Sequence, residues 1–205
     1  MLDAEFFRRW MLTTAAAVDR EADRLTELDS AIGDADHGAN LKRGFTAVRA
    51  ALEDDPPQTP GAVLVLAGRQ LISKVGGASG PLYGTLLRGT GKALGDDAEV
   101  TDAALRAALD DGVGAVAKLG GAAPGDKTML DALVPAVAAL GDGGDYAAAR
   151  AAAEKGAEAT VPIQARKGRA SYLGERSIGH RDPGATSSAL LFGALAETAE
   201  AVTGG

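Results

Sequence analysis

The sequence predicts an all-α protein, an up-down antiparallel barrel or bundle of eight helices. Alanine and leucine dominate, and β-branched residues are scattered. Apolar residues recur with the period of a helix rather than in alternation. No hairpin signal and no regular spacing of strands appear. At 205 residues the chain suits a single domain, residues 1–205, with a substantial buried core.

Clusters of glycine, proline and aspartate divide the chain into helical segments of ordinary length. We expect helices near residues 3–28, 39–54, 60–75, 80–95, 101–118, 127–141, 145–161 and 183–202. The run AVLVLAG at 62–68 could be a strand, but it fits a buried helix equally well.

Apolar spacing supports several of these segments. The first helix places Phe6, Trp10, Ala17, Leu25 and Leu28 near one face. The fifth has Leu105, Leu109, Val113 and Val116 at spacings of four, four and three, and the sixth has Met129, Leu130, Leu133, Val137 and Leu140. Pro135 should kink the sixth helix, because proline removes a backbone donor and crowds the preceding turn.

The seven connections are of two kinds. DDPPQTPG, GDDAEVTD and GDGGD are plain polar turns, whereas IGDADHGAN, KVGGASGPLYG, LGGAAPGDKTM and QARKGRASYLGERSIGHRDPG are unusual. The unusual ones are connections one, three, five and seven. Odd-numbered connections of an up-down bundle lie at the same end. The alternation therefore predicts one site at one end of the bundle.

Three aspartates in the first loop, Asp29, Asp34 and Asp36, suggest a metal site. Separations of five and two residues cannot share one helix face, so Gly33 should break the helix and fold the loop back. Clustered carboxylates repel unless a cation lies between them, and hard oxygens suit Mg²⁺ with phosphate co-ligands. An EF-hand is excluded because no closing glutamate follows. The alternative is a solvated turn in which Asp36 caps a helix.

A helix begins at the next four residues, His37, Gly38, Ala39 and Asn40. Gly38 would let the backbone approach a ligand closely, and the first-turn N–H groups attract anions. His37 is either a plain surface residue or a contact to phosphate or the metal shell. We favour the contact, because His37 follows the acidic cluster directly.

The third and fifth loops have weaker signals. Gly76, Gly77 and Gly80 surround Ala78 and Ser79, so this turn either cradles phosphate or ends one helix and starts another. The fifth loop is not a P-loop, because Asp126 interrupts the required order and no strand precedes it. It is instead expected to cap the next helix near Asp126, with Met129 as a core residue or a pocket residue.

The seventh loop is basic in an acidic protein. It carries Arg166, Lys167, Arg169, Arg176 and Arg181 against only Glu175 and Asp182. Such a run is either solvated surface or a phosphate clamp facing the aspartates, since arginine offers paired donors to phosphate oxygens. Asp182 should cap the last helix, with Pro183 in its first turn.

The composition argues against several classes of protein function. The net charge of −7 argues against nucleic-acid or membrane-surface binding, and the absence of cysteine excludes disulfides and thiolate chemistry. No signal peptide or membrane span is expected, so we expect a cytoplasmic protein. From the residues alone, the best interpretation is a nucleotide or polyphosphate site with magnesium that serves phosphoryl transfer.

Taken together, four segments resemble one known family. GDADHGAN, VGGASGPLYGT, PGDKTM and QARKGRASYLGERSIGHRDPGATS are similar to signatures of the nucleotide-binding L subunit of dihydroxyacetone kinase, the DhaL family. The resemblance covers essentially the whole chain. It implies an eight-helix barrel with a deep pocket for ADP or ATP and two Mg²⁺ ions, and the activity of a kinase with an alcohol acceptor, in glycerol metabolism.

The resemblance also implies site residues. The metal ligands would be Asp29, Asp34 and Asp36. The nucleotide would be bound by His37, Gly38, Ala39, Asn40, Ala78, Ser79, Gly120, Met129, Arg169, Asp182, Pro183 and Gly184. No catalytic residue is assigned.

Partner subunits are a further implication of the resemblance. A K subunit would hold dihydroxyacetone covalently, and the phosphohistidine of an M subunit would charge the retained ADP to ATP in the phosphotransferase-system form. A fused form uses free ATP and could phosphorylate another triose or a tetrose. Subunits of this type can also contact a transcription regulator. The related ATP-binding part of fatty-acid kinase has DGDTGTN where this chain has DADHGAN, so we rank it lower. The sequence leaves open whether the chain forms a homodimer.

Overall fold

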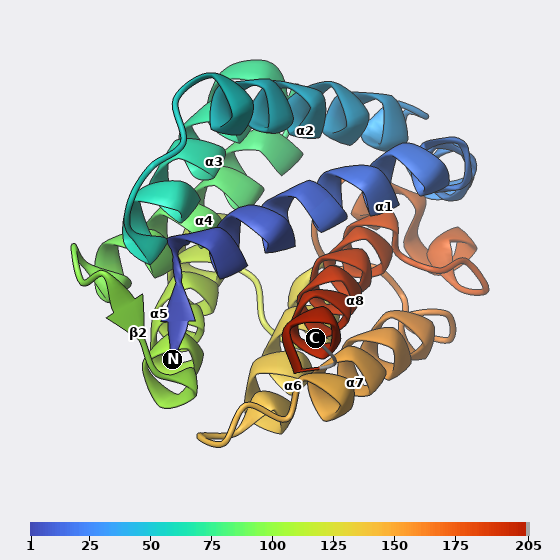
Figure 1. The fold of residues 1–205 in the computed structure, drawn as a ribbon. Helices are drawn as coiled ribbons and strands as arrows, with labels where there is room; N and C mark the ends of the chain where they lie inside the picture. Colours follow the sequence, from blue (N-terminus) through green and yellow to red (C-terminus); the bar gives the residue numbers. More distant parts are fainter. Residues whose placement is uncertain (204–205) are drawn as a thin grey trace.

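The computed structural model describes residues 1–203 and is built almost entirely from helices (Figure 1). The helices are α1 (Ala4–Ile32), α2 (His37–Asp54), α3 (Pro60–Lys74), α4 (Ser79–Leu94), α5 (Asp102–Gly120), α6 (Leu130–Leu140), α7 (Tyr146–Ala159) and α8 (Pro183–Thr203), with a 3₁₀ helix η1 (Arg169–Ser177) and the strands β1 (Leu2–Asp3) and β2 (Glu99–Val100). Within the described residues, no helix is both long and apolar enough to cross a bilayer.

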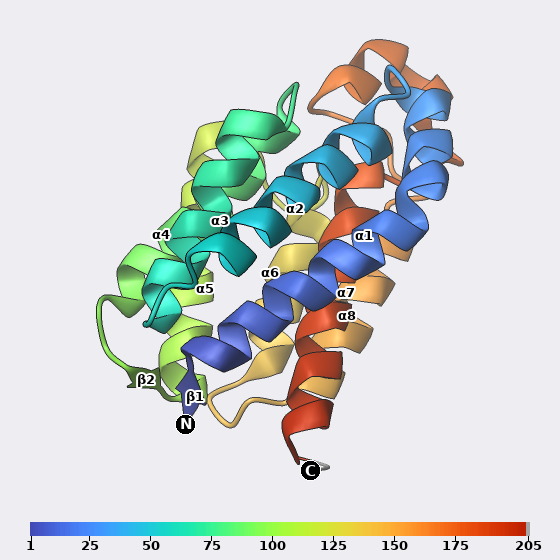
Figure 2. The same cartoon turned by 45° about the horizontal axis from the view of Figure 1, so that its top comes forward.

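The helices form a closed antiparallel ring. Each packs against the next along the chain, and α8 closes the ring against α1. Consecutive helices run in opposite directions, so the connections after α1, α3, α5 and α7 gather at one end (Figure 2). We call this the pocket end, and the other, which carries the start of the chain, the end of α8 and the remaining connections, the far end. The predicted fold class is confirmed.

Large apolar side chains on the inner helix faces fill the ring. Phe7, Trp10, Phe45 and Phe192 are almost completely buried and belong to one continuous core. The Trp10 indole also donates a hydrogen bond of 2.9 Å to the Leu191 carbonyl oxygen, which ties α1 to α8. A buried indole needs such a partner, because an unpaired donor in the core costs free energy.

Several features differ from the predicted elements. α1 continues to Ile32, past the predicted end at 28, so Asp29 lies in its last turn. The long seventh connection contains η1, which the sequence did not indicate. β1 and β2 form a two-residue antiparallel pair in which Leu2 opposes Val100. An element this short has no alternating pattern to recognise.

Pro135 lies inside α6, as predicted, and its ring cannot donate to the Asp131 carbonyl oxygen one turn earlier. Gly156 of α7 packs onto that oxygen so closely that a Cβ there would lie 2.1 Å from it. Only glycine allows this contact, so α6 and α7 meet closely where the proline frees a carbonyl. The kink itself stays a prediction.

Candidate functional site

A pocket of about 290 Å³ opens where the four unusual loops meet. It has an apolar inner wall that includes Ile32, Leu82, Val116 and Met129, and its rim carries aspartates and basic side chains. All four loops contribute residues, so the predicted convergence at one end is confirmed. The predicted residues that line the pocket are Asp29, Asp34, Asp36, His37, Ala78, Ser79, Gly120, Met129, Arg169, Asp182, Pro183 and Gly184.

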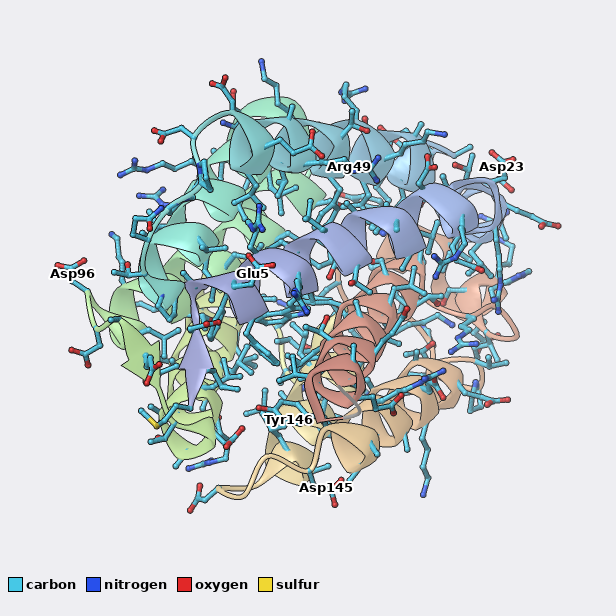
Figure 3. The ribbon with its side chains drawn as sticks, in the orientation of Figure 1. Glu5, Asp23, Arg49, Asp96, Asp145 and Tyr146 are labelled. Carbon is cyan, nitrogen blue, oxygen red and sulfur yellow. The ribbon has the colours of Figure 1, made fainter. Side chains whose placement is uncertain are left out.

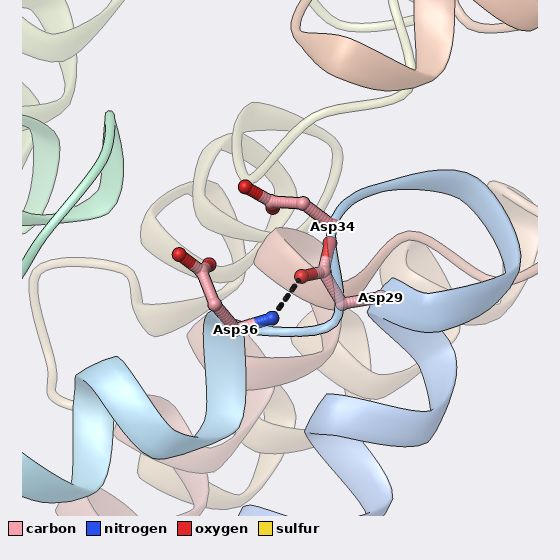
Figure 4. A group of neighbouring side chains, drawn as sticks. All are labelled: Asp29, Asp34 and Asp36. Atoms are coloured by element: carbon pink, nitrogen blue, oxygen red, sulfur yellow. Dashed lines mark hydrogen bonds between the residues drawn. The ribbon is translucent and has the colours of Figure 1, made fainter.

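The three aspartates come together at the rim. One carboxylate oxygen from each of Asp29, Asp34 and Asp36 lies within 4.8 Å of the others. Asp29 accepts hydrogen bonds from the backbone N–H groups of Asp36 (2.9 Å) and His37 (3.1 Å), which folds the loop back onto α1 (Figure 4). Gly33 supplies the predicted break as the residue that ends α1.

The alternative interpretation of Asp36 as a capping side chain is wrong. Asp36 precedes α2, but its carboxylate accepts no capping hydrogen bond. Asp29 takes that role from the end of α1. The Asp36 carboxylate is therefore available to a ligand.

This donor set fits a hard divalent cation. Three carboxylates held within 4.8 Å repel one another unless a positive charge lies between them. Arg169 supplies part of that charge, since its Nη2 lies 3.0 Å from Asp34 Oδ2. Oxygen ligands without sulfur or imidazole suit Mg²⁺, which keeps some of its waters.

Three predicted contacts lie away from the pocket wall. Gly38, Ala39 and Asn40 are not among the lining residues. A Cβ on Gly38 would lie 1.9 Å from the Ala22 carbonyl oxygen, so this glycine allows α2 to approach α1 rather than a ligand. The Asn40 side chain accepts a 2.6 Å hydrogen bond from Arg43.

His37 is buried at the start of α2 with both ring nitrogens engaged. Its Nδ1 lies 3.1 Å from Ser79 Oγ, and its Nε2 lies 2.9 Å from Ser187 Oγ. Burial lowers the pKa of His37, although Asp29, Asp36 and the Pro183 carbonyl act in the opposite direction. The ring thus links loops one and three to α8.

The basic seventh loop contributes less to the pocket than its composition indicates. Lys167 and Arg169 line the pocket, whereas Arg166, Arg176 and Arg181 do not. Two of the five basic side chains are thus placed to meet an anion. The sequence cannot separate them, because neither the irregular loop backbone nor the short 3₁₀ segment η1 has a long-range periodicity that would show which residues face inward.

Asp182 caps α8 as predicted and also borders the pocket. Its carboxylate accepts a 2.7 Å hydrogen bond from the Ala185 N–H. Burial raises the pKa of Asp182 to about 7; the Ala185 N–H and Lys127 oppose this rise, while Asp131 and Asp29 add to it. Ionisation of Asp182 is therefore costly, because its carboxyl group is buried and lies near the carboxylates of Asp131 and Asp29.

Lys127 is the main site residue that the sequence did not reveal. It is 1% exposed, has a positive φ of 63°, and lines the pocket. Its ammonium, with three N–H groups, lies within hydrogen-bond distance of four carbonyl oxygens, those of Thr160 (2.9 Å), Ile163 (3.0 Å), Ser177 (2.8 Å) and His180 (2.5 Å). Burial lowers the pKa of Lys127 while Asp182 and Asp131 raise it, and the four carbonyls require the charged form. Lys127 thus ties the fifth loop to the seventh.

Capping in the fifth loop differs from the prediction. The Asp126 carboxylate accepts from the Ala123 N–H (2.9 Å) and closes its own turn rather than the next helix. Asp131, already inside α6, reaches back to the N–H groups of Gly125 (2.5 Å) and Thr128 (2.7 Å). The prediction placed α6 too early, because the loop continues to Met129.

Comparison with known proteins places this architecture in a family. The family model described as DAK2 domain matches residues 31–197. The chain is 43% identical over 199 residues to the ADP-binding subunit DhaL of the PEP-dependent dihydroxyacetone kinase of Escherichia coli, covering 93% of this chain and 95% of that one. It is 42% identical to the corresponding subunit of Listeria innocua kinase 1, covering 96% and 97%.

A solved structure supports the same family. The dihydroxyacetone kinase of C. freundii in complex with AMP-PNP and Mg²⁺ matches with a TM-score of 0.75 and 29% identity, over 95% of this chain. This chain spans about a third (33%) of that kinase. From the fold, the convergent loops and these matches, we conclude that the chain belongs to the DAK2 domain family and is of the DhaL type.

Proposed function

We propose that this protein is the ADP/ATP- and Mg²⁺-binding phosphoryl-transfer subunit of a dihydroxyacetone kinase. The observation that carries the proposal is the meeting of three carboxylates, Lys167, Arg169 and the start of α4 around one pocket with an apolar wall. The acidic group suits a metal, the basic side chains suit phosphates, and the apolar wall suits a base. The E. coli relative is named as an ADP-binding subunit.

The rim suits a diphosphate or triphosphate bound through metal. Asp29, Asp34 and Asp36 would hold a pair of Mg²⁺ ions, which neutralise phosphate charge when bound. Arg169 lies beside the aspartates and would pair with phosphate oxygens once a metal takes Asp34. Ala78 and Ser79 begin α4 without a side-chain cap, so their N–H groups are available to an anion.

The inner pocket suits the nucleoside. Gly120 and Met129 lie on the wall near Leu82 and Val116, where burial of a flat base would remove apolar surface from water. Asp182, Pro183 and Gly184 also line the pocket, and Gly184 packs beside Met129. No side chain here is placed as a protein nucleophile, which agrees with catalysis by positioning and charge neutralisation.

A division of labour among subunits completes the proposal. A phosphohistidine of an M subunit would charge retained ADP to ATP, and a K subunit would present dihydroxyacetone as acceptor. The chain matches free-standing subunits over nearly their whole length, which favours the phosphoenolpyruvate-dependent form. Phosphorus NMR tests retention: nucleotide that exchanges freely and is not charged by an M-type donor would contradict this form.

The functional test is a coupled assay with K and M subunits, comparing phosphoenolpyruvate with ATP as donor. Asp29→Asn, Asp34→Asn and Asp36→Asn should each lower turnover and weaken Mg·ADP binding by about 10- to 100-fold. Asp96→Asn is the matched control, since Asp96 points away from the molecule at the far end (Figure 3). Three variants with unchanged turnover and nucleotide affinity would refute the metal assignment.

A second candidate is the nucleotide-binding part of an ATP-dependent triose or tetrose kinase. The chain is 41% identical to L-erythrulose 1-kinase of Mycolicibacterium smegmatis, but it covers only 33% of that protein. The same assay separates the two, because this form would turn over with ATP and without an M subunit.

A further inference from the structure

The long connection between α7 and α8 folds into a loop whose two ends meet. Residues 160–163 at its start lie against residues 177–182 at its end, and we call these two stretches the neck and the intervening residues 164–176 the tip. The Gly179 N–H donates a 2.8 Å hydrogen bond to the Val161 carbonyl oxygen across the neck. The tip therefore leaves and re-enters the fold at one place.

Lys127 reaches into this neck from the fifth loop. Its Nζ lies within hydrogen-bond distance of two carbonyl oxygens on the first side of the neck, those of Thr160 and Ile163. It also lies within hydrogen-bond distance of two on the second side, those of Ser177 and His180. One ammonium group thus binds both sides of the neck at once, and at 1% exposure of the residue little water competes with it.

The Lys127 ammonium has no donor left for a ligand. It carries three N–H groups, and the four carbonyl oxygens share them. Although Lys127 borders the pocket, its charged group is therefore engaged in the neck. The residue also has a φ of 63°, a conformation that costs a lysine free energy and persists only where surrounding contacts hold it.

The tip carries the two basic side chains that line the pocket. Lys167 and Arg169 belong to this stretch and are exposed. The tip packs through Ala165 and Ala170 beside Ile32, in a small apolar cluster that is separate from the main core. So small a cluster buries little apolar surface, and the position of the tip therefore depends on the neck.

We infer that Lys127 is a positioning residue that closes the neck and thereby holds Lys167 and Arg169 at the pocket rim, for an anion that Lys127 itself does not touch. The closure of the neck follows from the contacts alone. The identification of the anion as the phosphates of Mg·ADP rests on the proposed function.

The test uses Lys127→Gly in the full-length protein. Glycine adopts a positive φ without strain, so the substitution removes the ammonium and its stem while the backbone conformation stays accessible. Butylammonium is the lost side chain as a free ion and can restore the three N–H donors. Tetramethylammonium has the same charge but no N–H group, and is the matched control ion. Lys155→Ala, at an exposed position of α7, is the control variant.

Hydrogen exchange of the protein without metal or nucleotide measures the neck itself. In Lys127→Gly the Ala165 and Gly179 amides, which donate to Ser177 Oγ and to the Val161 carbonyl oxygen, should exchange about tenfold faster or more. Amides in the middle of α3 report global unfolding, so local opening is the change at the neck beyond theirs. Butylammonium should restore protection, and tetramethylammonium should not.

Affinity for Mg·ADP, measured by calorimetry, tests the consequence for the site. Lys127→Gly should weaken binding about 10- to 100-fold, and butylammonium should recover most of the loss. In a background of Lys167→Gln and Arg169→Gln the same substitution should cost less than about threefold, because the side chains that it positions are already absent. Lys155→Ala should leave the affinity unchanged.

Each outcome decides a separate step. Neck exchange that changes no more than that of α3, or that tetramethylammonium restores as well as butylammonium, overturns the closure by Lys127. An equal loss of affinity in the Lys167→Gln and Arg169→Gln background overturns the positioning role. If Lys127→Gly folds only with butylammonium, Lys127→Met, which keeps a stem but lacks the donors, takes its place in the exchange and affinity comparisons. A wild type that does not bind ADP would contradict the proposed function, while the exchange result would still decide the closure.

Discussion

The helix starts at the two ends of the barrel are built differently. At the far end α1, α3, α5 and α7 each begin with a side-chain cap. Asp3, Thr59, Thr101 and Asp145 each accept a hydrogen bond from the N–H three residues later. At the pocket end α2, α4 and α6 begin without such a bond, and within residues 1–203 only α8 there has its own cap, from Asp182.

The difference shows that helix starts at the pocket end give up the stability of a side-chain cap and keep N–H groups that a ligand can bind. A side-chain cap satisfies an N–H group that would otherwise need water or a ligand. At the pocket end such groups are left to distant partners, such as Asp29 for α2, or remain available beside the cavity. The far end supports the fold, and the pocket end depends on contacts between loops. Four predictions test this contrast, in order of decreasing effect.

The largest effect is expected for Lys127→Met. The substitution leaves four carbonyl oxygens without their shared donor and should lower the free energy of unfolding by about 3–5 kcal/mol in urea titrations. The exposed Lys155 on α7 provides the matched control, Lys155→Met, which should change it by less than about 0.5 kcal/mol. Equal losses in both variants would show that the carbonyl cluster does not need its cation.

The next effect concerns pH. Because the folded-state pKa of Asp182 is raised to about 7 from an ordinary value of 3.8, its contribution to stability is complete below pH 4 and is lost as pH rises to 7. Asp182→Asn keeps an acceptor for the Ala185 N–H but cannot titrate.

We therefore expect the wild type to lose about 1–3 kcal/mol relative to Asp182→Asn between pH 4 and pH 8, measured without metal or nucleotide. Asp145→Asn, at an exposed far-end cap, should follow the wild type across this range. Parallel curves for wild type and Asp182→Asn would mean that Asp182 is charged throughout.

A smaller effect is expected at the far end. Thr101→Ala removes the α5 cap and should cost about 1 kcal/mol of stability. Because Thr101 lies at the end opposite the pocket, the affinity for Mg·ADP should be unchanged by calorimetry. A loss of affinity similar to that of the aspartate variants would contradict the division between the two ends.

The smallest effect on stability is expected for Arg169→Gln. The ion pair of Arg169 with Asp34 joins side chains that are 69% and 36% exposed. The free energy of unfolding should therefore change by less than about 0.5 kcal/mol. Affinity for Mg²⁺ alone should rise about two- to fivefold, because Asp34 loses a competing cation. Arg176→Gln, outside the pocket lining, serves as control, and a fall in Mg²⁺ affinity with Arg169→Gln would contradict this role.

The helical period of apolar residues and the clusters of helix-breaking residues between helices made the fold predictable. Regular apolar spacing identified the helices, and the alternation of plain and unusual loops identified the end that carries the site. The same signals missed η1 and extended α6 too far, since irregular loop backbone has no period. Boundaries moved where side chains such as Asp131 reach back into a loop.

The site was predictable where a residue type is unusual for its surroundings. Clustered aspartates and a basic loop in an acidic chain are such signals, and Asp29, Asp34, Asp36 and Arg169 do meet. Lys127 could not be identified, because its role depends on four backbone carbonyls distant in sequence. Gly38 was assigned to a ligand, although its close neighbour is the Ala22 carbonyl of α1.

The closure of the ring between α1 and α8 has a consequence for biosynthesis. Asp29 near the start and Asp182 near the end of the chain border one pocket, and Trp10 bonds across to Leu191. A nascent chain on the ribosome therefore lacks a wall of the pocket until α8 has emerged from the exit tunnel. Ligand capture must follow release of the C-terminal helix, and a prematurely terminated product would expose the inner face of α1 to chaperones.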